Sequence, residues 1–167
     1  MSYLLDTNLV IQSWSYQVGS ESFDCDRIDE LYRTGQERLA SDLVALHDLF
    51  AHSSERGWPI FCVAPATVRE VGQSTERDAA AIIRWAYELA EYAAPDDWRQ
   101  ERISHFQAEV LHGHSRGVDS ILLAEAGRLG CEALLTCDYR LHRRRNEINR
   151  LGPIVLRPVE LAERLAA

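Results

Sequence analysis

Short apolar runs alternate along this chain with longer segments in which apolar residues recur at helical spacing. The short runs predict buried strands at 2–5, 60–64, 133–136 and 154–156. Helical spacing is clearest at 36–54 and at 75–93. In the first of these segments, Leu39, Leu43 and Leu46 share one face. Strands that alternate with helices predict a parallel sheet that is covered by helices on both faces.

The remaining segments extend this pattern. Helices are also predicted at 24–33, from Pro65 onward, from a cap at Asp96 and Asp97 to about residue 111, at 120–129 and at 159–165, with a helix or loop at 7–18 and a polar loop at 112–117. Together these elements predict a single α/β domain over 1–167 with three layers and a central parallel sheet of four to five strands. A longer helical segment at about 19–58 separates the first two strands.

The composition is that of a globular domain. The 167 residues are 46% hydrophobic and 26% charged, which is enough for one full core. No apolar run reaches the length of a membrane span, and the first residues lack the basic and apolar regions of a signal peptide. We therefore expect a cytoplasmic protein with no membrane partner.

Cysteine spacing and net charge argue against several classes of site and of binding protein. The four cysteines, Cys25, Cys62, Cys131 and Cys137, form no Cys-x-x-Cys pair. This spacing argues against zinc and against a disulfide framework, and it favours reduced core thiols at Cys62 and Cys131. The formal net charge of −8 argues against broad electrostatic binding of nucleic acid, but it permits a local basic patch beside an acidic metal site.

Acidic residues stand at the ends of predicted strands or early in the helices that follow. Asp6 ends the first strand, Glu70 lies in the helix after the second, Asp119 opens a helix, and Asp138 follows a later strand. Each carboxylate taken singly could cap a helix. However, these positions share one end of a parallel sheet, where ligands bind. Four carboxylates there would repel one another unless a cation neutralised them, and an oxygen-only set favours Mg²⁺ or Mn²⁺.

The stretches LLDTN, VRE, GVDSILLAEA and LLTCD together resemble the PIN-domain family, over residues 3 to about 156. The resemblance implies a 5′-nuclease-like fold whose active site is built from Asp6, Glu70, Asp119 and Asp138, with Asn8 and Thr136 at the family's supporting polar positions. The small VapC-type toxin ribonucleases look most similar. The segment 19–58 is longer than expected between the first two strands of such a compact toxin.

The resemblance implies a Mg²⁺-dependent endoribonuclease, with Mn²⁺ as a substitute, that hydrolyses RNA phosphodiester bonds as the toxin of a toxin–antitoxin pair. One or two ions would be held by Asp6, Asp119 and Asp138, and Glu70 could bind metal directly, through water, or act as a base. A cognate antitoxin and a homodimer are the implied partners beside RNA. The alternatives are a PIN nuclease of RNA processing, or a catalytically silent PIN domain that binds RNA or protein.

Several other residues carry weaker expectations. Arg140, Arg143 and Arg144 follow Asp138 and could contact substrate phosphates, or they could form a solvated face that pairs with Glu147. Thr7 is expected to cap the helix after the first strand, and Glu125 is expected to face solvent.

Overall fold

The computed structural model describes residues 1–73, 78–94, 118–149 and 153–167. It contains one sheet of five strands in the order β3-β2-β1-β4-β5, and every pair of neighbouring strands is parallel. The strands are β1 (Ser2–Leu5), β2 (Ile60–Val63), β3 (Glu91–Tyr92), β4 (Ala133–Leu135) and β5 (Ile154–Leu156). This confirms the predicted α/β class and the central parallel sheet.

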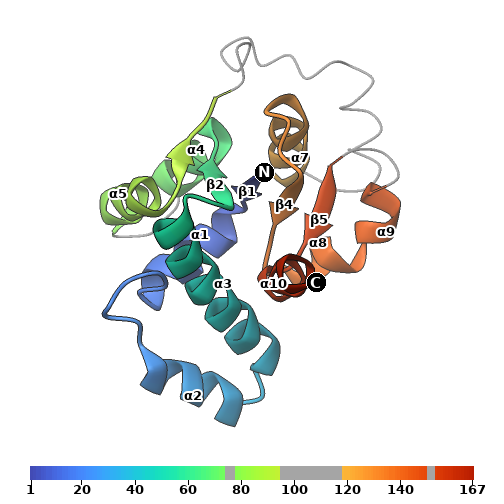
Figure 1. The fold of residues 1–167 in the computed structure, drawn as a ribbon. Coiled ribbons are helices and arrows are strands. Elements are labelled where there is room, and N and C mark those ends of the chain that lie inside the picture. Colours follow the sequence, from blue (N-terminus) through green and yellow to red (C-terminus); the bar gives the residue numbers. More distant parts are fainter. Residues whose placement is uncertain (74–77, 95–117, 150–152) are drawn as a thin grey trace.

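Helices cover both faces of this sheet (Figure 1). They are α1 (Thr7–Ser15), α2 (Cys25–Arg33), α3 (Glu37–Arg56), α4 (Pro65–Gln73), α5 (Ala79–Leu89), α7 (Val118–Arg128), α8 (Tyr139–Arg143), α9 (Arg145–Ile148) and α10 (Pro158–Ala166). None of the helices in the described ranges is long and apolar enough to cross a membrane.

Side chains of each central strand alternate between two hydrophobic cores, which makes the fold a three-layer α/β/α arrangement of the PIN-like kind. On β1, Tyr3 and Leu5 enter the core formed with α1, α2, α3, α5 and α10, whereas Leu4 enters the core formed with α7, α8 and α9. Cys62 and Cys131 lie reduced in this second core, as expected. Because the strands are buried on both faces, they read as continuous apolar runs in the sequence.

The structure corrects the end of the helix predicted at 75–93. Helix α5 ends at Leu89, Ala90 has extended backbone angles, and Glu91 and Tyr92 pair with Cys62 and Val63 as the edge strand β3. Both residues of β3 are exposed, so no apolar run marked them as a strand. The helix predicted to run to about residue 111 and the loop predicted at 112–117 lie outside the described residues.

Helix α3 extends from the outer side of the molecule toward the sheet and packs against α2 and α10 (Figure 1). It ends at Gly57, whose φ of 72° is the left-handed conformation that glycine adopts without strain. Its first turns approach α8 and α10, because Arg38 contacts His142 and the Arg157 guanidinium donates to the Arg38 carbonyl. Residues of the long 19–58 segment therefore lie close to residues that follow β4.

Candidate functional site at the carboxyl ends of the central strands

Asp6 lies where β1 passes into α1. Its backbone N–H donates to the Leu135 carbonyl at 2.9 Å, and its side chain is only 4% exposed. It occupies the N-cap position of α1, but its side chain makes no capping hydrogen bond there. Thr7 is the first helical residue, and its buried hydroxyl has no hydrogen-bond partner among the described residues, so the prediction that Thr7 caps α1 is wrong.

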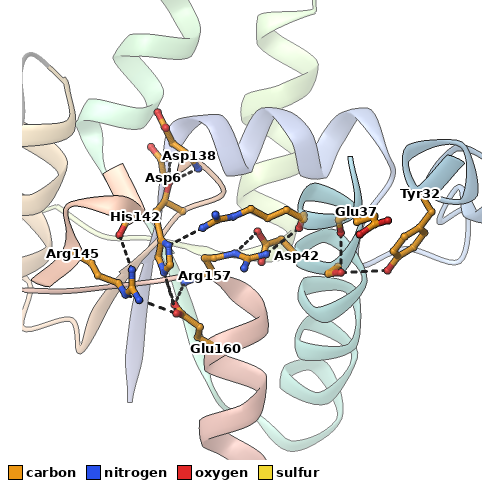
Figure 2. Close-up of polar contacts among 12 residues, drawn as sticks. Asp6, Tyr32, Glu37, Asp42, Asp138, His142, Arg145, Arg157 and Glu160 are labelled. Atoms are coloured by element: carbon orange, nitrogen blue, oxygen red, sulfur yellow. Dashed lines mark hydrogen bonds and ion pairs between the residues drawn. The ribbon is translucent and has the colours of Figure 1, made fainter. Parts of the chain in front are cut away.

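The hydroxyl of Thr136 connects Asp6 to Asp138. Thr136 is fully buried just after β4; its Oγ1 donates to Asp6 Oδ2 at 2.7 Å and accepts from the Asp138 N–H at 2.9 Å. The parallel pairing of Leu5 with Leu135 places these strand ends next to each other. Figure 2 shows Asp6 and Asp138 together above His142. Two of the four predicted carboxylates and one supporting residue are therefore brought into one hydrogen-bonded group.

Asp138 also caps α8. Its Oδ1 accepts a hydrogen bond from the backbone N–H of Arg140 at 2.7 Å. The capping interpretation and the functional interpretation are thus compatible at this residue, whereas at Asp6 the side chain does not cap the helix. Within the described part of the site, Asp6 and Asp138 supply the oxygen donors that suit a hard cation such as Mg²⁺.

The other predicted site residues, Glu70, Asp119 and Asn8, belong to helices α4, α7 and α1. Glu70 lines a pocket of about 120 Å³ between α4 and α7, together with Ile121 of α7. Asp119 is the second residue of α7, and its side chain lies outside the described residues. Asn8 is exposed in the first turn of α1. No group of three or more His, Cys, Asp or Glu side chains suited to a metal is found among the described residues.

Asp42 is a further carboxylate near this site that was not among the residues predicted from the sequence. It is fully buried in α3 and accepts from Arg157 Nε at 3.0 Å. Burial raises the pKa of the Asp42 carboxyl, with Arg157 opposing the shift. Burial, together with the charges of Asp6, Asp42 and Asp138, raises the pKa of the Cys137 thiol. These carboxylates therefore contribute to one negative field around Cys137.

Buried His142 lies beside the site and contacts both a basic and an acidic side chain. The Nδ1 atom of His142 is 2.7 Å from Arg38 Nη2, and its Nε2 atom is 2.9 Å from Glu160 Oε2 (Figure 2). Burial lowers the pKa of His142, and the charges of Arg145 and Arg38 act in the same direction, while Glu160 opposes them. The neutral ring fits both contacts, since Nδ1 then accepts from Arg38 and Nε2–H donates to Glu160.

The three predicted phosphate-contacting arginines are all exposed. Arg140 and Arg143 belong to α8, and Arg144 follows them. The Arg144 guanidinium lies 3.8 Å from Glu147, so the predicted pairing with Glu147 is confirmed for this residue. Phosphate contact by the three arginines stays a prediction.

Glu125 does not face solvent as predicted. Its side chain is buried between α7 and α4, and its Oε2 atom is 3.4 Å from the backbone N–H of Ala66 in the first turn of α4. Burial raises the pKa of Glu125, and the Ala66 N–H and Arg69 oppose this shift. Glu125 lies three residues after Leu122, and that helical spacing was the signal that could have placed it on the buried face.

The fold and these contacts define a class: a parallel α/β protein with two carboxylates joined by a buried threonine hydroxyl at the carboxyl ends of its two central strands. No protein-family model matches the chain, and no curated protein matches it either.

Proposed function

We propose that this protein is a metal-dependent endoribonuclease of the PIN-domain type that hydrolyses RNA phosphodiester bonds. The observation that carries the proposal is the Thr136 hydroxyl, which holds the Asp6 carboxylate next to Asp138. The site lies at the carboxyl ends of parallel strands, where open α/β sheets bind their ligands. Asp6 is buried, its side chain does not cap its own helix, and the Thr136 hydroxyl holds its carboxylate at this edge of the sheet.

The donor chemistry fits Mg²⁺, with Mn²⁺ as a substitute. Asp6 and Asp138 would hold the ion with Asp119 and Glu70, and Asn8 would support them. When bound, the ion supplies positive charge that activates water and offsets the charge building on the phosphate. The chain's own contribution is orientation: the Thr136 hydroxyl fixes Asp6 Oδ2, and the Arg140 N–H fixes Asp138 Oδ1. Arg140, Arg143 and Arg144 would bind flanking phosphates.

The finer proposal is a cytoplasmic toxin of a toxin–antitoxin pair, with an antitoxin and a second copy of the chain as partners. The helices α2 and α3 between β1 and β2 favour a second candidate, a PIN nuclease of RNA processing, because they enlarge the protein beyond a compact toxin. Growth arrest on expression, relieved by a small protein encoded beside it, is expected only for the toxin. Unimpaired growth during expression of active enzyme supports the second candidate.

The nuclease proposal is tested with Asp6→Asn. The isosteric amide removes the charge, so we expect Mn²⁺-dependent cleavage of RNA to fall by more than ~100-fold, beyond the loss typical of residues that only orient metal ligands. Circular dichroism checks that the variant is folded, and EDTA should stop the wild type. Asp29→Asn changes an exposed carboxylate of α2 and should cleave normally. Wild-type cleavage rates from folded Asp6→Asn would overturn the proposal.

A further inference from the structure

The long segment between β1 and β2 brings one basic side chain to the candidate site. Arg38, in the first turn of α3, has its guanidinium carbon 4.4 Å from the centre of the Tyr139 ring. Tyr139 follows Asp138 directly and is 53% exposed. Arg38 also contacts His142, a residue 104 positions away in the sequence. The 19–58 segment thus places the Arg38 guanidinium against the residues that directly follow Asp138, a predicted metal ligand.

Arg38 differs from two neighbouring arginines in its ion pairing. Arg157 pairs with Asp42 at 3.0 Å, and Arg145 lies 4.0 Å from Glu160. Arg38 forms no ion pair with any carboxylate in the described ranges. The charge of Arg38 acts on the Asp42 carboxyl, whose pKa it lowers, but the direct partner of Asp42 is Arg157. A partly buried arginine without a carboxylate in direct contact is suited to an anionic ligand, and a guanidinium matches phosphate in particular.

The surrounding contacts hold this guanidinium in one orientation. Arg38 donates through Nη2 to His142, and His142 is held in turn by Glu160. Glu160 also accepts from the backbone N–H of Arg157 at 2.9 Å, which ties it to the start of α10. With one face against Tyr139, the guanidinium is pre-organised, so a phosphate that binds it meets a small entropic cost.

We propose that Arg38 binds a backbone phosphate of the RNA substrate, next to the position at which the chain is cut. The inference rests on the proposed nuclease function and assigns a role to the 19–58 segment, which is to deliver this arginine. Exposed Tyr139 lies beside it, where a nucleobase adjoining that phosphate can stack. The substrate class is therefore single-stranded RNA, in which the bases are available for stacking.

Salt-dependent binding of a fluorescent single-stranded RNA to the full chain, in EDTA so that no cleavage occurs, tests this contact. For Arg38→Gln we expect about tenfold weaker binding, as for the loss of one hydrogen bond to a charged group. We also expect a salt slope lowered by about 0.7, the share of one phosphate on a single strand. Arg38→Met keeps an apolar stem on Tyr139, and we expect the same loss of affinity and of salt slope as for Arg38→Gln. This variant provides a second test if the glutamine variant does not fold. Arg38→Lys should restore the slope.

A matched control is available in the same segment. Arg27 of α2 also stacks on a tyrosine, with its guanidinium 4.3 Å from the centre of the Tyr16 ring. We expect Arg27→Gln to leave RNA affinity and salt slope unchanged. A merely structural Arg38 would change thermal stability in its variants but would leave the salt slope at the wild-type value.

The outcomes separate this inference from the nuclease proposal. If the wild type cleaves RNA and folded Arg38→Gln or Arg38→Met keeps the wild-type salt slope and kcat/KM, the Arg38 inference is overturned and the nuclease stands. If the wild type does not cleave with Mn²⁺ but binds RNA through Arg38, the nuclease proposal fails and the phosphate contact stands. A wild type that does not bind RNA overturns the inference.

Discussion

Replacing Thr136 by valine isolates the hydroxyl that joins the two carboxylates. Valine has nearly the same shape, so the fully buried position stays filled while both hydrogen bonds are lost. The Asp6 Oδ2 atom loses a donor at 2.7 Å, and the Asp138 N–H loses an acceptor at 2.9 Å. Thr136→Ser is the matched control, because it keeps the hydroxyl and removes only a buried methyl group.

The expected loss follows from these two contacts. A hydrogen bond to a charged group contributes about 1.5–3 kcal/mol, and a fully buried N–H left without a partner costs about 1–3 kcal/mol. The Asp138 N–H is only partly buried, so its share lies at the low end of the second range. Allowing for some relaxation, we expect Thr136→Val to lower the free energy of unfolding by about 3 kcal/mol. Thr136→Ser should lose about 1 kcal/mol, the value of one buried methyl group.

Urea unfolding followed by circular dichroism measures the difference directly, and thermal melting checks it. For a domain of this size, 3 kcal/mol corresponds to about 6–12 °C in Tm. The decisive comparison is between valine and serine, since both disturb the packing at the same site. If Thr136→Val is within ~0.5 kcal/mol of Thr136→Ser, the hydroxyl does not bridge Asp6 and Asp138 as the structure indicates.

Two further predictions concern the groups around α8 and α10. Burial lowers the pKa of His142 in the folded protein below its ordinary 6.5. As the pH falls, His142 is therefore protonated in the unfolded chain before it is protonated in the folded protein. The stability that the neutral ring contributes is complete above about pH 6.5 and is lost as the pH drops through the lowered pKa. Urea unfolding between pH 7.5 and 5 should show this fall, and His142→Gln should remove that part of it. Arg157→Leu leaves the buried Asp42 carboxylate without its partner at 3.0 Å, and we expect a loss of about 3–5 kcal/mol. The double variant Arg157→Leu/Asp42→Leu should recover most of this loss in the same assay, and a double variant as unstable as the single one would refute the buried-charge explanation.

The sequence predicted the central elements well because their signal is local. The strands at 2–5 and 154–156 match β1 and β5, since an apolar run bounded by polar residues needs no partner to be recognised. Edge strand β3 was missed because its two exposed residues form no such run. The short helices α8 and α9 were missed because neither exceeds five residues, which is too short for helical periodicity to show.

The candidate site was predictable where residues follow strand ends and unpredictable where distant segments meet. Asp6, Thr136 and Asp138 were found because parallel strands bring their carboxyl ends together. Asp42 was missed although it interrupts an apolar face of α3, which is itself a signal of a buried charge with a partner. The contact of Arg38 with His142 spans 104 positions and depends on how α3 packs, so no local pattern encodes it.

Asp6 and Asp138 therefore give different information when each is mutated. The Asp138 carboxylate caps α8 through the Arg140 N–H, so an effect of its removal on activity would be mixed with a loss of helix stability. The Asp6 carboxylate makes no such bond to α1, and its burial carries a desolvation cost that the hydrogen bond from Thr136 opposes. Asp6→Asn is therefore a more direct test of the proposed metal site than Asp138→Asn, because it leaves the cap of α8 in place.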